Sequence, residues 1–407
     1  MTLRIVLSPF LATVVFAQSH VLSLANAIAE AESRHPAGSV AEGRVAAAEG
    51  LRLQAGLGVN PRLYLQSENT RFWQSPGFVY PRDADTFAYF SQVFEIAGKR
   101  ERRKELAAAN VKISELDRAV TRRQIAARVS LAYWSAVAAA RVRTVIDENA
   151  ATFERIVQYH RDRVREGAIA EVDLLRVLLE RDRLLVNART AAQEYEQAVI
   201  NLQREMGRVT FDPALTLSDT LSDVRDVSPP DIQEVLRSRL ETAEGQANVE
   251  RAHRNVALQQ SLAKQDPEVL FGYKRTAGYN TMIGGLQWNL PLRNRNQGQI
   301  ASAQAEVRVA ENQARLVESQ VRADVEAAWA AYQGRKKLLT ETLGPMQQRA
   351  DEIARIALAA YREGGLDLLR LIDAERARLE ALTLYYRALA DYQQSVTTLQ
   401  IVTGAPL

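Results

Sequence analysis

The sequence is internally duplicated, and this feature constrains its fold more than any local motif. The tripeptide Arg-Glu-Gly at residues 165–167 returns at 362–364 with an offset of 197 residues. Nearer the N-terminus, Arg100 matches Arg295 with an offset of 195 residues. Self-similarity over a long period indicates that one structural unit is repeated. We expect each unit to contain short strands, a very long helix, a glycine turn and a returning helix, and neither unit to form a closed object alone.

The chain is expected to be exported and then to divide into two repeats. Residues 1–17 combine a positive charge, a short apolar run and a small-x-small cleavage site, which predicts a signal peptide. The run is shorter than the ~20 apolar residues of a spanning helix, and no later segment has that character. We expect a first repeat over residues 18–207, a linker rich in Asp, Ser, Thr and Pro over 208–230, and a second repeat over 231–404.

Long helices dominate both repeats. Strong helix formers fill residues 99–165 without a proline, and a shorter run follows over about 171–206. The second repeat has the same pattern over about 294–362 and 367–402, with a kink expected at the Gly-Pro pair 344–345. Periodic helices of this length indicate coiled-coil packing rather than a globular domain.

Four short segments are expected to be strands. They are rich in aromatic and β-branched residues and cover about 62–72, 86–96, 268–276 and 281–292. In the last one, apolar Met282 and Leu286 alternate with polar Thr281 and Gln287, the period of a sheet between two different solvents.

Four strands are too few for a closed wall in lipid. Strands of ~9–11 residues fit an outer-membrane barrel, and the smallest such barrels need about eight. Open sheet edges are not tolerated in lipid, so several chains would have to pool their strands. Three chains would supply about twelve strands. The shortage predicts an oligomer, although it does not by itself fix the number three.

Composition excludes several classes of function. The chain has no cysteine, and its net charge of +3 is the difference between 52 basic and 49 acidic residues, too balanced to indicate nucleic-acid binding. No phosphate-binding loop, nucleophile elbow or zinc-protease motif occurs, so an enzyme is not expected. The four histidines lack ligand spacing, so we expect neither a metal site nor a cofactor, and we expect these side chains at the surface: His20, His35, His160 and His253.

Motifs at the helical turns and at the ends of the repeats carry a family resemblance. They are Tyr-x-x-Gly at 361–364 followed by Leu368 and the Asp-Ala pair at 373–374, Val-x-x-Gly at 164–167 followed by Asp173 and Leu175, and Leu-x-x-x-x-Gly at 202–207 and 399–404. With the duplication, these motifs resemble the TolC family of outer-membrane efflux channels over essentially the whole mature chain. The strand-to-helix junctions at 94–100 and 289–298 are similar to those of its heavy-metal, cobalt-zinc-cadmium branch.

The resemblance implies a mainly α fold with a small β part. Its four strands would join a twelve-stranded trimeric outer-membrane β-barrel, above a long periplasmic α-helical barrel. It also implies a passive exit duct that conducts heavy-metal cations and works with a periplasmic membrane-fusion adaptor and a proton-driven inner-membrane pump of the RND type. Many relatives carry a lipidated N-terminal cysteine, and no such lipidation is expected here. An exit duct for drugs and a soluble periplasmic coiled-coil adaptor are the alternatives.

The two glycine turns are the first candidate site. Both glycines are expected to end a helix with a positive φ, which accounts for their presence. The resemblance implies in addition that the tips dock the adaptor, through Arg165, Glu166, Gly167, Arg362, Glu363 and Gly364.

The channel aperture is the second candidate site. The resemblance implies acidic residues six and nine positions after the second tip glycine, where this chain has Arg370 and Asp373. The first repeat has Asp173 and Arg176 at the same positions. A mixture of arginine and aspartate would close the tip by salt bridges rather than by an acidic ring. Solvated charges on a helix face are the alternative.

Overall fold

A computed structural model describes residues 21–71, 73, 77–221, 224 and 226–405, so the predicted signal peptide lies outside the described residues. The chain forms two compact units. The helical unit comprises Met1–His35, Ile125–Asp226 and Tyr332–Thr397, and the sheet unit comprises Pro36–Gln124, Val227–Ala331 and Thr398–Leu407. Each unit therefore combines segments of both predicted repeats.

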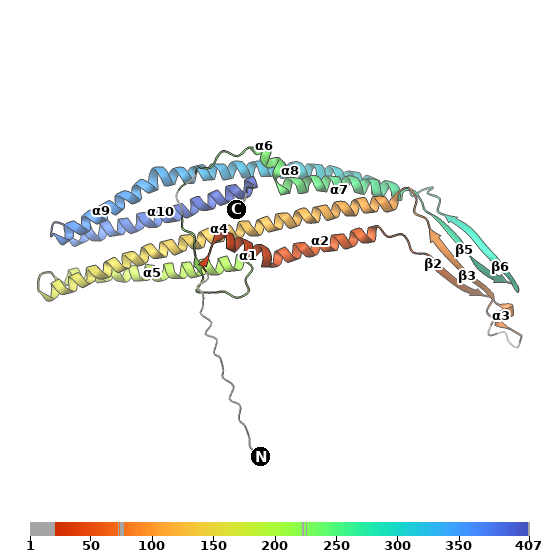
Figure 1. Cartoon of the computed structure of the whole chain (residues 1–407), viewed down its shortest axis with the longest axis horizontal. Coiled ribbons are helices and arrows are strands. Elements are labelled where there is room, and N and C mark those ends of the chain that lie inside the picture. Colours follow the sequence, from red (N-terminus) through yellow and green to blue (C-terminus); the bar gives the residue numbers. More distant parts are fainter. Residues whose placement is uncertain (1–20, 72, 74–76, 222–223, 225, 406–407) are drawn as a thin grey trace, which may run out of the picture. The chain divides into compact units, whose positions relative to one another are not determined.

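Two helical hairpins make up most of the helical unit (Figure 1). Its elements are the C-terminal part of α4 (Lys99–Arg165), α5 (Glu171–Glu205), α9 (Gly344–Arg362), most of α10 (Leu368–Thr403), the short α1 (Leu24–Arg34), the π-helical segment η1 (Leu338–Leu343), and strands β1 (Val21–Leu22) and β4 (Thr216–Leu217). Both glycine turns lie at the same end of this unit.

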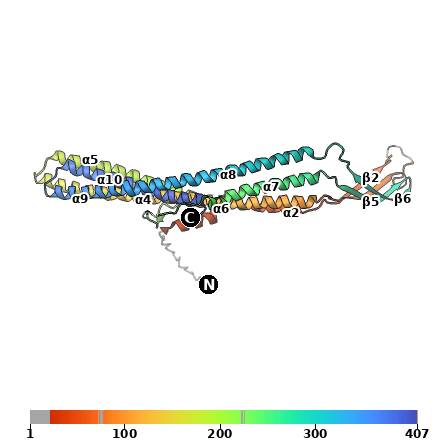
Figure 2. The same cartoon turned by 90° about the horizontal axis from the view of Figure 1, so that it is seen from above.

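The sheet unit joins a helical part to one antiparallel sheet (Figures 1 and 2). Its helices are α2 (Pro36–Ala55), α3 (Tyr80–Asp83), α6 (Ile232–Ser238), α7 (Leu240–Leu262), most of α8 (Gln297–Lys337) and the N-terminal part of α4. Its strands are β2 (Arg62–Glu68), β3 (Asp85–Val93), β5 (Pro267–Thr276) and β6 (Tyr279–Trp288). The molecule therefore has the predicted composition, mainly α with a small β part.

The sheet has the order β2-β3-β5-β6, so the central ladder joins the two repeats. Among the described residues, β2 and β6 each pair on one side only. The register brings one apolar set to one face, because Phe271 lies opposite both Phe90 and Gly284 and Val269 lies opposite Leu286. This apolar face carries exposed Leu63, Leu65, Phe90, Val269, Phe271, Tyr273, Met282, Leu286 and Trp288.

The opposite face of the sheet is mixed and mostly polar. Lys274 lies opposite Thr281, and its ammonium group is 5.3 Å from the ring centroid of Phe87. The two faces are therefore suited to two different solvents.

The β5–β6 turn is tighter than the expected strand bounds imply. Strand β6 covers Tyr279–Trp288 rather than about 281–292. Ala277 and Gly278 have φ of 51° and 83°, the positive values that a two-residue hairpin turn requires. The strand also ends earlier than expected, before Pro291, which has no backbone N–H to donate to a ladder.

The second long helix is interrupted where the first is not. Helix α4 is a single α-helix of 67 residues, whereas its counterpart consists of α8, η1 and α9. In the π-helical segment the Gly344 N–H donates to the carbonyl of Leu339, five residues back, and Pro345 follows without an N–H. The kink expected at 344–345 therefore takes the form of a π-helical turn just before it.

The predicted linker contributes an unexpected strand. Thr216–Leu217 pairs in parallel with Val21–Leu22, within the helical unit. Buried Tyr133 fixes this pairing: its hydroxyl donates to the carbonyl of Leu22 (2.9 Å) and accepts from the N–H of Asp219 (3.3 Å). Burial raises the pKa of Tyr133 to about 12, so this hydroxyl stays protonated.

Candidate functional site

The two tips have the same backbone construction. Gly167 and Gly364 have φ of 71° and 77°, which confirms the expected glycine caps. In each tip the N–H after the glycine bonds a carbonyl five residues back: Ala168 to Arg163 and Gly365 to Ala360, both at 2.9 Å. This is the pattern of a Schellman cap, and all six candidate docking residues are exposed.

A buried histidine links the two hairpins next to the tips, so the expectation that the histidines lie at the surface is wrong for His160. The His160 side chain is 0% exposed; its Nδ1 is 2.8 Å from the carbonyl of Ile156, and its Nε2 is 2.8 Å from the hydroxyl of Tyr361. The rings of His160 and Tyr361 are stacked with centroids 5.7 Å apart. Because the Nδ1–H must donate to the carbonyl, Nε2 accepts from Tyr361, and α4 is thereby joined to α9.

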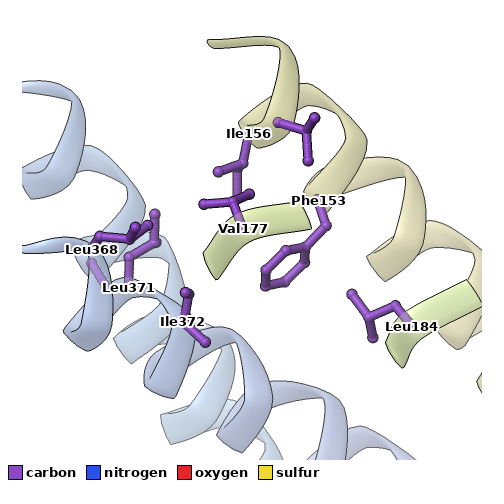
Figure 3. Close-up of a cluster of buried hydrophobic side chains, with 9 residues drawn as sticks. Phe153, Ile156, Val177, Leu184, Leu368, Leu371 and Ile372 are labelled. Carbon is purple, nitrogen blue, oxygen red and sulfur yellow. The ribbon is translucent and has the colours of Figure 1, made fainter. Parts of the chain in front are cut away.

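Below this pair, four helices share one hydrophobic core (Figure 3). Its buried members are Phe153, Ile156, Val157, Val177, Leu184, Ala357, Leu368, Leu371 and Ile372. The residues come from α4, α5, α9 and α10, so each hairpin is held in place by the other. The tips therefore stand on a packed support.

Each of the four candidate aperture residues is paired with a residue three positions away in the sequence. Asp173 lies 3.6 Å from Arg176 on α5, and Asp373 lies 3.9 Å from Arg376 on α10. Arg370 pairs with Asp367, at 3.4 Å, instead of with Asp373. These are neighbours three residues apart, exposed except for half-buried Asp173, and pairs of this kind contribute little to stability, so their side chains are available for other partners.

An ion pair next to the candidate aperture residue Asp373 crosses between the hairpins. Glu180 on α5 is buried and accepts two hydrogen bonds from Arg376 on α10, one of them 3.0 Å from Nε to Oε1. Hydrogen bonding to Arg376 lowers the pKa of Glu180. Since Arg376 also lies beside Asp373, this candidate aperture residue is connected to the bridge.

A second buried carboxyl lies further along α10. Glu375 is almost fully buried, 3.5 Å from the amide of Asn149 on α4 and 3.6 Å from Arg378. Arg378 in turn bonds Asp351 on α9 at 2.8 Å. Burial raises the pKa of Glu375, and Arg378 opposes this effect. This cluster ties α10 to both neighbouring helices.

Sequence reasoning missed these crosslinks because they join distant residues: His160–Tyr361, Glu180–Arg376 and Asn149–Glu375 are each about 200 positions apart, and Arg378–Asp351 are 27 apart. A signal for His160 was nevertheless present, since it follows Phe153, Ile156 and Val157 at the spacing of one helix face. Glu375 follows Leu368, Leu371 and Ile372 at the same spacing, whereas no comparable signal marks Glu180.

No helix among the described residues is both long and apolar enough to cross a membrane. No group of three or more His, Cys, Asp or Glu side chains in the described part of the chain is placed to hold a metal ion.

The chain is similar in sequence to known proteins. Residues 27–208 match the family model of outer membrane efflux proteins. The cobalt-zinc-cadmium resistance protein CzcC of Cupriavidus metallidurans is 23% identical over 367 residues, which cover 88% of this chain and 84% of that protein.

Solved structures have the same fold over nearly the whole chain. The open-state MtrE outer membrane channel of Neisseria gonorrhoeae superposes with a TM-score of 0.77 at 17% identity, over 94% of this chain and 89% of that one. CusC, solved in a study of folding and transmembrane channel formation, gives a TM-score of 0.76 at 14% identity, over 94% of this chain and 92% of that one. Residues 27–208 thus match the outer membrane efflux proteins, and the chain as a whole is similar to CzcC of the heavy-metal branch and shares the fold of CusC, which agrees with the resemblance and the non-enzymatic character inferred from the sequence.

Proposed function

We propose that this outer-membrane efflux protein is the passive exit duct of a tripartite system and works as a trimer. The observation that carries the proposal is the sheet, which has an exposed apolar face and a mostly polar face. In the described residues, the strand at each edge of the sheet pairs on one side only. An apolar face of this size on a soluble sheet would promote aggregation, whereas lipid solvates it.

The open edges support an assembly of several chains. An unpaired strand edge in lipid leaves backbone N–H and C=O groups without partners, at a cost of several kcal/mol each. Pairing β6 of one chain with β2 of the next would satisfy both edges, and three chains would complete the twelve-stranded barrel expected from the sequence.

The helices offer a matching contact. Exposed apolar residues on α5 follow one helix face: Val172, Leu175, Leu179 and Val186. Helix α9 exposes Ile353 and Ile356 in the same unit. Apolar stripes of this spacing favour helix-to-helix packing between neighbouring chains.

The proposed partners and cargo follow from the tips and from the family. The paired glycine turns give each chain two exposed tips for a periplasmic adaptor, which would connect the duct to a proton-driven inner-membrane pump. The name of the relative CzcC supports cobalt, zinc and cadmium ions as the cargo. Because a duct needs no tight site, selectivity would reside in the pump.

We further propose that Arg370 and Asp373 narrow the aperture. Both are exposed beside the second tip, and each exchanges its partner three residues away at little energetic cost. Arg370→Ala and Asp373→Ala should each raise single-channel conductance in planar bilayers. Arg387→Ala is the matched control, because Arg387 is exposed on the same helix but far from the tip. Unchanged conductance in both tip variants would remove the aperture role.

The overall function is tested in two steps. Purified full-length protein should require detergent, run as a trimer after crosslinking and form pores in planar bilayers. A monomer that is soluble without detergent would exclude the duct and support a soluble adaptor. Deletion of the gene should then sensitise cells to cobalt, zinc or cadmium, whereas sensitivity to dyes and drugs alone would replace the metal cargo with organic compounds.

A further inference from the structure

The two strand-to-helix junctions of the sheet unit occupy equivalent places in the repeats but differ in charge balance. The first joins β3 to α4 over residues 94–98, and the second joins β6 to α8 over residues 289–296. Arg100 and Arg295 are the matched arginines of the two junctions, with the offset of 195 residues noted above. The two junctions are therefore equivalent segments of the two repeats, and their charges can be compared directly.

Carboxylates neutralise two basic side chains of the first junction. Lys99 is only 5% exposed and lies 2.8 Å from Asp266. Arg103 donates hydrogen bonds to both carboxylate oxygens of Glu95, one of them 3.0 Å long. Hydrogen bonding to Arg103 lowers the pKa of Glu95, so the pair stays charged and mutually satisfied. Arg100 is exposed and donates to the backbone carbonyl of Gly56, without an ion pair to any described residue, so one arginine of this junction remains unneutralised.

The second junction has no such neutralisation. Arg293 and Arg295 are exposed, and neither forms an ion pair with any residue that the structure describes. The Nε of Arg295 donates only to the backbone carbonyl of Pro291, at 3.2 Å. Two guanidinium groups, which suit phosphate oxygens geometrically, are thus left facing solvent within three residues of each other.

Apolar side chains accompany these two arginines. Leu290 and Leu292 are 70% and 77% exposed, and Trp288 ends the apolar face of the sheet. The indole N–H of Trp288 donates to the carbonyl of Gln265 at 3.0 Å. A tryptophan at the end of an apolar band, next to arginines, is the composition of a membrane–water interface.

Hydrogen bonds hold the segment in one shape. The amide of Asn296, a residue with φ of 60°, donates to the carbonyl and side chain of Gln259 on α7, at 2.8 and 3.0 Å. The Gln297 side chain donates to the carbonyl of Arg293 at 3.2 Å. The arginines are therefore presented from an ordered backbone, which lowers the entropic cost of binding.

We propose that the β6–α8 junction binds the phosphate groups of anionic phospholipids, with Arg293 and Arg295 as the phosphate ligands and Leu290 and Leu292 among the acyl chains. This inference rests on the proposed function, since it requires the apolar face of the sheet to lie in a bilayer. Positive charge at the junction complements the lipid phosphates, and the apolar face continues into the junction. An anionic surface attracts each nearby arginine by an amount equivalent to about a fivefold change in affinity.

The test uses the detergent-purified full-length oligomer and native mass spectrometry with added lipid. Phosphatidylglycerol should bind in preference to phosphatidylcholine. Arg293→Gln and Arg295→Gln should each weaken phosphatidylglycerol binding about fivefold, with little change for phosphatidylcholine. Arg308→Gln is the matched control, because Arg308 is exposed on α8 away from the junction and should have no effect.

Replacing both arginines by lysine tests whether positive charge, rather than a change in folding, accounts for the loss of lipid binding. The double variant Arg293→Lys with Arg295→Lys should keep most of the preference for the anionic lipid. The double variant Arg293→Gln with Arg295→Gln should lose that preference. Equal phosphatidylglycerol binding by this double glutamine variant and by the parent protein would overturn the inference. Dissociation of the oligomer in the glutamine variant, with lipid binding unchanged, would also overturn it and would place a second chain on the junction. In both cases pore formation by the parent protein would leave the proposed function standing.

Discussion

The sheet and the helical hairpins deal with apolar side chains in opposite ways. The hairpins bury Phe153, Val177 and Leu371 among four helices of the same chain. The sheet leaves Phe271 and Met282 exposed on a face that nothing in its own unit covers. The helical core can therefore form within one chain, whereas the sheet is completed only by what surrounds it. Stability in one region is intramolecular, and in the other, under the proposed function, it depends on lipid and on neighbouring chains.

The strongest challenge to this comparison is a charge in the middle of the apolar face. Phe271→Arg should cost about 2–4 kcal/mol in each chain once the face is in lipid, because arginine is expelled from the bilayer centre. Three chains would sum this cost, so trimers should fail to insert. The measurement is the yield of heat-modifiable trimer in outer-membrane fractions.

Thr281→Arg is the control for the sheet, since Thr281 lies on the opposite face beside Lys274. It should assemble normally and change only the conductance of the pore. Equal loss of trimer in both variants would mean that the two faces do not meet different solvents.

A smaller effect should follow from truncation in the helical core. Leu371 is 0% exposed, so Leu371→Ala should cost about 2–5 kcal/mol by removing contacts and leaving a cavity. Leu369 is 55% exposed two residues away, and Leu369→Ala should change stability by no more than about 0.5 kcal/mol. Urea unfolding followed by circular dichroism in detergent would compare them. Similar losses for both would show that the core is not confined to one chain.

The smallest effect concerns the buried carboxyl of the helical unit. Burial raises the pKa of Glu375 above its unfolded value of about 4.3, so its favourable contribution is present below that pH and is lost as pH rises through the folded pKa. Glu375→Gln stays neutral throughout. The variant should therefore match the parent near pH 4 and exceed it in stability at pH 7, by about 0.5–1.5 kcal/mol, the range of a single hydrogen bond. Thermal unfolding at both pH values checks this, and a variant that is weaker at pH 7 would show that the ion pair with Arg378 outweighs the cost of burial.

Much of this architecture could be predicted because its signals are local or repeated. The duplication, the proline-free run of α4 and the alternation in β6 each depend on residues close together in sequence or on an exact internal offset. The positive φ of Gly167 and Gly364 followed from the end of a periodic run. Such features need no knowledge of what packs against them.

The missed features depend on distant partners. The β1–β4 pair joins residues about 195 apart and consists of two residues per strand, too short for a periodic pattern. The tautomer and burial of His160 depend on Tyr361 in the other repeat. The π-helical segment before Gly344 shows that a proline signal locates a disturbance but leaves its form open.

The strand order affects how a closed barrel of three chains would assemble. Strand β3 of the first copy already pairs with β5 of the second inside one chain, and the unpaired edges, β2 and β6, belong to the first and second copy respectively. A ring of three chains would thus hold six seams between copies, three covalently tethered at synthesis and three made by collision. Gene duplication would have halved the number of separate chains that must associate, from six single repeats to three duplicated chains. Every pairing between neighbouring repeats would remain of the same kind.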